Sequence, residues 1–139
     1  MIPYGKQDIS KEDIDAVIEV LKSDFLTQGP KVPDFQDALT SVCNAKYAIA
    51  VNSATSALHI ACMALGLGED DWLWTSPITF VATANAAIYC GAKVDFVDID
   101  PRTYNMCPEK LKEKLAIAHS NNKLPKVLVP VHLCGQSCD

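Results

Sequence analysis

Several features that define common protein classes are missing from this sequence of 139 residues. No apolar run approaches the ~18 residues of a membrane-spanning helix. The polar start, MIPYGKQDISKED, lacks the apolar stretch of a signal peptide. The net charge of −5 leaves no basic excess, which argues against a nucleic-acid-binding protein. We therefore expect one cytoplasmic domain whose partners include neither membrane nor nucleic acid.

Short diagnostic motifs are missing as well. Neither GxGxxG nor GxxxxGK(S/T) occurs, so the sequence supports neither a dinucleotide-binding fold nor a P-loop. The six cysteines are irregularly spaced and form no CxxC pair. Without a secretory signal, this spacing favours reduced thiols over a disulfide framework. Nothing resembles a Ser-His-Asp triad.

What the sequence does contain is an alternation of helical and strand patterns. Apolar residues at helical spacing predict a first helix that has Ser10 as its N-cap, Glu12 and Asp13 in its first turn, and an end near Ser23. The same spacing predicts helices at 33–43, 56–65 and 80–89, and a further helix that begins at Pro108. Short apolar runs predict buried strands at 47–51, 72–75, 93–97 and 126–131. Two helices followed by strands and helices in turn imply an α/β fold: a mostly parallel sheet in a three-layer αβα arrangement.

The predicted strand at 47–51 runs into a turn of small polar residues, 52–56, and then into a helix that is apolar nearly all round. Such a helix is expected to be buried on most sides. The first N–H groups of a helix have no intrahelical partner, so this turn is a candidate anion site. Serine and threonine are also good helix caps, and that simpler interpretation stays open.

Phe80 is expected near the same edge of the sheet as the turn at 53–55. Its ring could stack on a flat ligand there, or merely cap the core. The last eight residues include four side chains of types that can bind metal ions: His132, Cys134, Cys138 and Asp139. A zinc site would need clearer spacing and further ligands. A loop near an active site, or plain packing, is the other interpretation.

Three aspartates near the end of one predicted strand, Asp95, Asp98 and Asp100, suggest the phosphoacceptor of a receiver domain. The two leading helices do not fit that class, and an acidic pair after a first strand is missing. Asp100-Pro101 is a common way to open a turn, and Asp98 can cap the loop. We therefore expect no metal site in this chain.

Four motifs carry a family resemblance, in order along the whole chain: LTQGP (26–30), NSATSALHIA (52–61), TSPITFVATANAA (75–87) and VDFVDIDPRTYNM (94–106). Together they resemble the DegT/StrS family of sugar aminotransferases, fold-type I pyridoxal-phosphate enzymes that act on nucleotide-linked keto-sugars. The segments TSPITFVATAN and HLCGQSCD are most similar to a branch of the family on the route to pseudaminic acid. The resemblance implies that residues 1–139 are the N-terminal portion of the cofactor-binding large domain, preceded by two helices at about 10–43, with no second domain.

The resemblance also implies a site. Ala54 and Thr55 would hold the phosphate of pyridoxal phosphate, and Phe80 would lie over its pyridine ring. The substrate side would be formed by Tyr4, Asp24, Phe25, Leu26, Thr27 and again Ala54. The partners implied are a UDP-linked keto-sugar, glutamate as amino donor, and a second copy of the protein, because the family's site is shared across a homodimer.

One departure limits the expected activity. The family's aspartate that pairs with the pyridinium nitrogen, and the lysine that holds the cofactor covalently, are both expected beyond residue 139. None of the lysines here follows a strand in the family's lysine motif. We therefore expect no catalytic residue in this chain, which looks like the front part of an aminotransferase and should be inactive alone. The alternative is a non-catalytic, truncated paralogue that binds a phosphate or nucleotide-sugar, or pairs with a full-length subunit.

Overall fold

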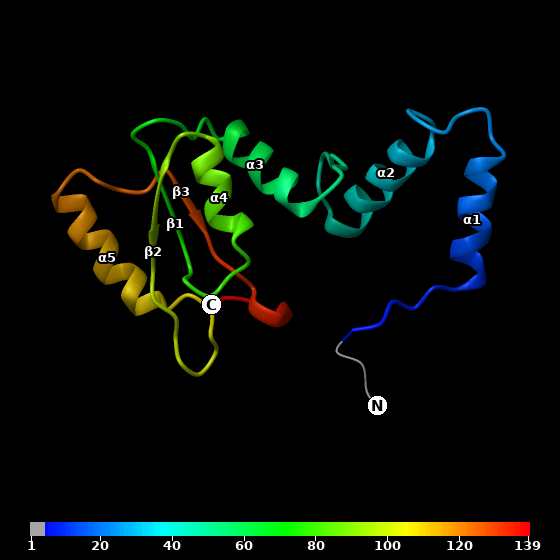
Figure 1. Ribbon diagram of the computed structural model, residues 1–139. Coiled ribbons are helices and arrows are strands. Elements are labelled where there is room, and N and C mark those ends of the chain that lie inside the picture. The colour runs from blue at the N-terminus through cyan, green and yellow to red at the C-terminus, as the bar shows by residue number, and fades with distance from the viewer. Residues whose placement is uncertain (1–4) are drawn as a thin grey trace. The chain divides into compact units, whose positions relative to one another are not determined.

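The computed structural model describes residues 5–139 and contains two compact units, and the chain passes from one to the other after Ala50. The N-terminal unit consists of two helices, α1 (Lys11–Leu21) and α2 (Lys31–Cys43) (Figure 1). The C-terminal unit, Val51–Asp139, holds the sheet. Across the described residues, no helix has both the length and the apolar character needed to cross a membrane.

Helix α1 begins as its sequence predicts. The Ser10 hydroxyl accepts a hydrogen bond from the Asp13 amide, and the Asp13 carboxylate accepts one from the Ser10 amide, which together form a capping box. The apolar stripe of α1 faces outward: its side chains are 40–64% exposed, and they are Ile14, Val17, Ile18 and Leu21. Helix α2 ends at Asn44, whose φ of 50° places it in the left-handed conformation common after helices.

The predicted strand at 47–51 is wrong. This segment has no regular secondary structure, and Tyr47 and Ile49 are 74% and 75% exposed. A strand exists only where a neighbouring strand supplies ladder hydrogen bonds, and no strand in the described part of the chain lies against this segment. The Gln36 side chain instead accepts the hydrogen bond of the Ala50 amide at 2.9 Å.

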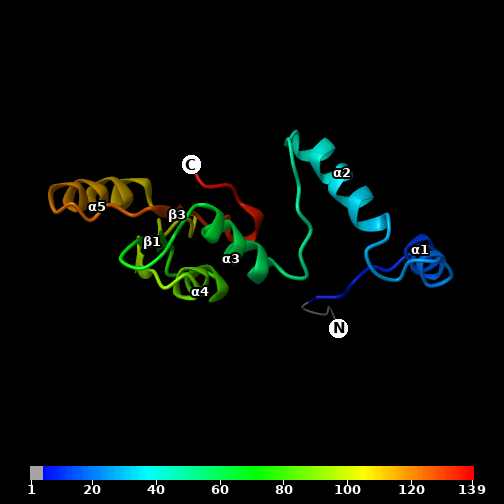
Figure 2. The same ribbon diagram turned by 90° about the horizontal axis from the view of Figure 1, so that it is seen from above.

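The C-terminal unit confirms the three-layer αβα prediction. Its strands are all parallel and lie in the order β2-β1-β3. Helices α3 and α4 cover one face of the sheet and α5 covers the other (Figure 2). The elements of this unit are α3 (Ala54–Ala64), β1 (Trp72–Thr75), α4 (Ala82–Tyr89), β2 (Lys93–Phe96), α5 (Pro108–Ser120), β3 (Val127–Val129) and a 3-10 turn, η1 (Leu133–Gly135).

Successive residues of β1 point into two separate apolar layers, as the period of a strand requires. Leu73 is fully buried against α3 and α4, whereas Trp74 packs with Met106 and Ala118 on the α5 side. The expectation that α3 is buried on most sides is wrong, because Cys62 is its single buried residue. The described chain covers α3 only on the side of α4 and the sheet, so Ile60 and Met63 stay 39% and 59% exposed.

Candidate functional site at the carboxyl edge of the sheet

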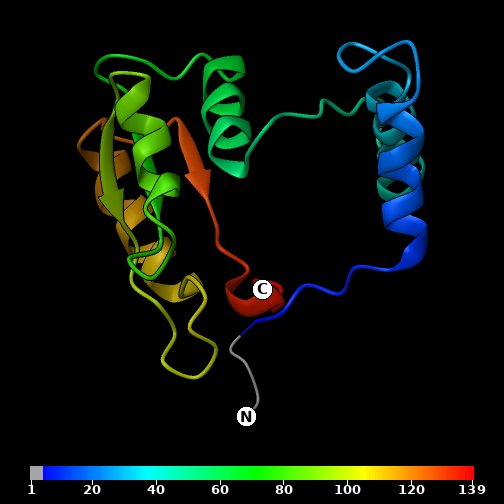
Figure 3. The same ribbon diagram turned by 45° about the vertical axis from the view of Figure 1, so that its right-hand side comes forward.

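Because the three strands are parallel, their carboxyl ends lie at one edge of the sheet. Helices α3 and α4 both begin toward this edge, and β3 continues from it into η1 (Figure 3). The loop at 97–107, which follows β2, also begins there. In open α/β sheets, ligands bind at this edge, so the side chains gathered here are the candidate site of the C-terminal unit.

A network of short polar side chains shapes the start of α3. The Ser53 hydroxyl accepts a hydrogen bond from the Ser56 amide at 3.1 Å, which makes Ser53 the N-cap. The Ser56 hydroxyl in turn donates to Asn52 Oδ1 at 2.7 Å. The simpler capping interpretation of this turn is therefore correct as far as Ser53 is concerned.

The cap leaves two backbone N–H donors unused beside it. Within residues 5–139, neither the Ala54 nor the Thr55 amide finds a protein acceptor, and the first turn of α3 contains no acidic side chain. Ala54 is exposed and Thr55 is half-buried, so the amides are not closed over by packing. Two N–H donors, a threonine hydroxyl and the positive end of a helix dipole match the chemistry of a phosphate group.

Phe80 lies just before α4, at the same edge. Its backbone carbonyl accepts a hydrogen bond from the Thr83 amide at 3.0 Å, and its side chain is 75% exposed. The hydroxyls of Thr79 and Thr83, 2.9 Å apart, hold the turn that carries it. In this structure the ring does not cap the core, and its exposure leaves it accessible to a planar ligand.

The three aspartates after β2 each have a structural partner. Asp95 pairs with Lys114 at 2.6 Å, and Asp98 caps the Ile99 amide at 2.8 Å. Asp100 accepts hydrogen bonds from both the backbone amide and the guanidinium of Arg102, which lower the pKa of its carboxyl from 3.8 to about 2. Caps and ion pairs thus account for a cluster that resembles a phosphoacceptor site in sequence.

The turn after β3 is held by residues that are distant in sequence. His132 Nδ1 accepts a hydrogen bond from the Cys138 amide at 3.0 Å. The Asn105 side chain bonds to the backbone of this turn and is only 3% exposed. Sequence analysis missed Asn105, because an asparagine in a polar loop gives no local sign that its partners lie about thirty positions later.

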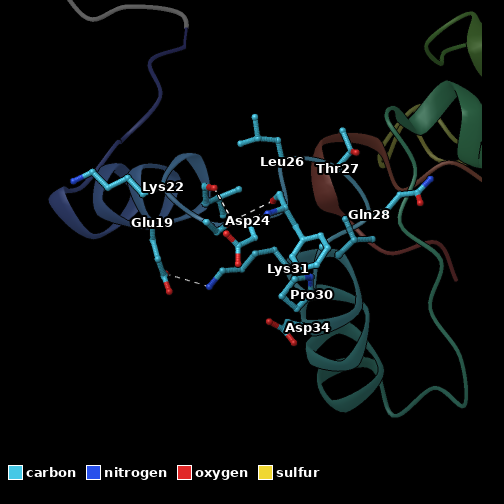
Figure 4. Close-up of a pocket in the computed structure, with 14 residues that line it drawn as sticks. Glu19, Lys22, Asp24, Leu26, Thr27, Gln28, Pro30, Lys31 and Asp34 are labelled. Atoms are coloured by element: carbon cyan, nitrogen blue, oxygen red, sulfur yellow. Dashed lines mark hydrogen bonds and ion pairs between the residues drawn. The ribbon is translucent and has the colours of Figure 1, made fainter.

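Four of the predicted substrate-side residues lie in the N-terminal unit, between α1 and α2, whereas Ala54 is the first residue of α3 in the C-terminal unit. Asp24, Phe25, Leu26 and Thr27 line a cavity of about 610 Å³ formed by the turn and the adjoining helix ends (Figure 4). An ion pair between Lys31 and Glu19, at 3.2 Å, joins the two helices beside it. The Ser23 hydroxyl accepts from the Phe25 amide and fixes the start of the turn. Tyr4, also predicted for the substrate side, lies outside the described residues.

The sequence was compared with protein-family models and with known proteins. The model of the DegT/DnrJ/EryC1/StrS aminotransferase family matches residues 7–139. The spore coat polysaccharide biosynthesis protein SpsC of Bacillus subtilis is 44% identical over 138 residues, which are 99% of this chain and 34% of that protein. The UDP-4-amino-4,6-dideoxy-N-acetyl-beta-L-altrosamine transaminase of Campylobacter jejuni is 49% identical over 115 residues, 83% of this chain and 30% of that enzyme.

Solved structures agree with these relatives. The putative sugar aminotransferase Spr1654 of Streptococcus pneumoniae has been solved in a PMP-form and a PLP-form, with TM-scores of 0.89 and 0.88 and identities of 30% and 28%. The match to the PMP-form covers 99% of this chain and 33% of that one. The chain thus spans about a third of the length of the proteins that it matches.

Proposed function

This chain belongs to the DegT/DnrJ/EryC1/StrS aminotransferase family, and from that premise we propose that the whole protein transfers an amino group to a nucleotide-linked keto-sugar with pyridoxal phosphate as cofactor. The observation that carries the proposal is the start of α3, where the Ala54 and Thr55 amides stay open beside a polar turn. The family supplies the reaction class, and the turn supplies a chemically suitable place for the phosphate of the cofactor.

Each residue of the proposed cofactor site has a distinct task. The Ala54 and Thr55 amides and the Thr55 hydroxyl bind the phosphate, while Ser53 and Ser56 hold the turn in the required shape. Phe80 provides a flat apolar wall for a planar ring and excludes water from that side. Pyridoxal phosphate, when bound, supplies the electron sink on which amino transfer depends.

The proposed substrate is a UDP-linked 4-keto-6-deoxy sugar. Support comes from the 49% identity to the Campylobacter jejuni transaminase. The resemblance of the segment TSPITFVATAN to one branch of the family also favours a place on a route to pseudaminic acid. Asp24, Phe25, Leu26 and Thr27 are proposed to contact this substrate, together with Ala54. The cavity that the first four line is large enough for part of a sugar nucleotide.

The remaining parts of the proposal rest on the family resemblance. They are a cytoplasmic homodimer, glutamate as the amino donor, and a catalytic lysine and aspartate supplied from outside these 139 residues. The chain's own residues are proposed to bind and orient the ligands, and none of them is proposed as the covalent lysine or as the carboxylate that pairs with the ring nitrogen. Residues 1–139 alone are therefore proposed to bind phosphate without turnover.

Thr55→Ala tests the cofactor site. In the whole protein, the variant loses the hydroxyl but keeps the amide, so its affinity for pyridoxal phosphate should fall by about 1–3 kcal/mol. Titration calorimetry of the cofactor-free protein with pyridoxal phosphate measures this change. Thr55→Ser, which keeps the hydroxyl, should bind nearly as tightly as the parent.

Thr40→Ala is the matched control, because the Thr40 hydroxyl only bonds to the Asp37 carbonyl within α2. Unchanged affinity in Thr55→Ala would contradict the assigned phosphate site. Loss of binding in Thr40→Ala as well would point to a general loss of folding. A whole protein that binds pyridoxal phosphate or a UDP-sugar without transferring an amino group would support the alternative of a non-catalytic binding protein.

A further inference from the structure

The side chain of Asn105 joins two loops that follow different strands. Its Nδ2 donates to the carbonyls of Gln136 at 3.0 Å and Ser137 at 3.1 Å, and its Oδ1 accepts from the Leu133 amide at 3.0 Å. Both amide protons and one carbonyl lone pair are thus used. Because the side chain is 3% exposed, water cannot replace these partners at low cost.

The bridge crosses the end of the central strand. Asn105 belongs to the loop after β2 and its partners belong to the turn after β3, whereas β1 lies between those two strands. The loop that carries Asn105 is itself rigid: the Asp100 amide donates to the Asn105 carbonyl at 2.9 Å, and Ile99 and Met106 form an antiparallel bridge. A fixed loop therefore holds the less regular turn at the carboxyl edge.

That turn presents an imidazole with a defined tautomer. His132 Nδ1 accepts the Cys138 amide hydrogen at 3.0 Å, so the neutral ring carries its proton on Nε2. His132 is exposed and lies three positions after the end of β3 at Val129, on the side of the sheet where ligands of such folds bind. The backbone of the same turn includes Leu133, whose amide is held by Asn105.

We propose that Asn105 is a positioning residue, which fixes the turn after β3 so that His132 donates a hydrogen bond from Nε2 to an oxygen atom of the bound nucleotide-sugar. Only the carboxamide supplies two donors and one acceptor in this geometry; an aspartate would set a negative charge against two carbonyl oxygens. The inference rests on the proposed function in one respect, namely that the ligand at this edge is a nucleotide-linked sugar.

Three variants of the whole protein separate the positioning role of Asn105 from the hydrogen bond that His132 donates. Asn105→Asp removes the donors and releases the turn. His132→Asn keeps an acceptor near the position of Nδ1, for the Cys138 amide, but removes the outer donor. Leu73→Val is the control: it weakens the core on the α3–α4 side of the sheet and touches neither the turn nor Asn105. The probe is UDP-N-acetylglucosamine, its dissociation constant is measured by calorimetry, and amide hydrogen exchange reports the order of residues 133–138.

We expect Asn105→Asp to speed exchange in 133–138 and to weaken the binding of UDP-N-acetylglucosamine on the order of tenfold, which is the loss of about one good hydrogen bond. His132→Asn should weaken binding similarly while exchange in the turn stays as in the parent. Leu73→Val should lower the melting temperature and leave the dissociation constant unchanged. This pattern separates positioning from a general loss of stability.

The inference would be overturned if His132→Asn bound UDP-N-acetylglucosamine as tightly as the parent protein. It would also be overturned if Asn105→Asp did so despite faster exchange, or if the parent protein did not bind this probe. The proposed function is judged separately, by amino transfer to a keto-sugar and by pyridoxal phosphate binding. A protein that binds the UDP-sugar through His132 yet transfers no amino group would refute the function and leave the inference standing.

Discussion

The Asp100 side chain forms several hydrogen bonds within the loop that follows β2. Its carboxylate accepts from the Arg102 amide at 2.7 Å and from the Arg102 guanidinium at 2.8 Å, and the first effect of this pairing is a pKa lowered to about 2. The Tyr104 amide donates to the Asp100 carbonyl at 2.8 Å, so the same residue also fixes the backbone, which turns at Tyr104 with a φ of 61°. Ionised Asp100 therefore contributes, through Arg102, to holding the loop that carries Asn105.

The lowered pKa of Asp100 predicts a pH dependence with a definite sign. A carboxyl whose folded pKa is below its unfolded value contributes stability above the unfolded value, about 3.9, and loses it as the pH falls toward the folded value of about 2. Arg102→Leu should raise the pKa of Asp100 and flatten the decline in unfolding free energy between pH 4 and 2. Carboxyl ¹³C NMR titration and urea unfolding measure the two effects. An unchanged titration of Asp100 in Arg102→Leu would exclude the pair as the cause.

Residues of the candidate site whose hydrogen-bond partners are close in sequence could be predicted, whereas residues whose partners are distant in sequence could not. A cap within the turn at 52–56 was predictable because Ser and Thr are good helix caps, and the structure assigns that role to Ser53. Asn105 was not predictable, because its acceptors are Gln136 and Ser137 and only the folded sheet brings them near. Whether Thr55 binds a phosphate stays a prediction, although its surroundings suit one.

At the scale of elements, the predicted starts of α1 and α5 agree with the structure, whereas those of α2, α3 and α4 each differ from it by two residues. A hydroxyl residue followed by an acidic first turn placed the start of α1 at Lys11, and the capping box between Ser10 and Asp13 gives the reason. The predicted strand at 47–51 failed because strand formation is not local. An apolar run becomes a strand only when another strand pairs with it, and periodicity in one segment contains no information about that partner.

Removing the cap of α1 should cost stability without changing the fold. Ser10→Ala deletes the acceptor for the Asp13 amide and should lower the stability of the N-terminal unit by about 0.5–2 kcal/mol. Amide hydrogen exchange across 11–21 in the whole protein measures this loss as faster exchange in the first turn. Ser41→Ala is the control, because the Ser41 hydroxyl bonds within α2 to the Asp37 carbonyl and caps no helix. Equal effects in both variants would contradict a capping role for Ser10.

At the scale of the whole molecule, the exposed stripe of α1 needs explanation. A helix in a folded protein normally turns such a stripe toward a core, yet Ile14, Val17 and Leu21 are 50–64% exposed. Further large apolar side chains, Phe25 and Phe35, are 59% and 55% exposed in the same unit. Water-exposed apolar surface of this extent favours association, which agrees with the proposed homodimer without showing which face is used.

Association of the 139-residue chain is therefore expected, and its dependence on α1 can be measured. Val17→Glu places a charge within the apolar stripe, so light scattering should show a smaller mean mass than for the parent chain at equal concentration. Ala116→Glu adds the same charge at an exposed position of α5, outside α1, and should associate as the parent does. If both variants associate equally, the stripe is not what drives assembly; a monodisperse monomeric parent would remove the premise altogether. Circular dichroism of each variant must retain the helix signal, because an unfolded α1 would change mass for a different reason.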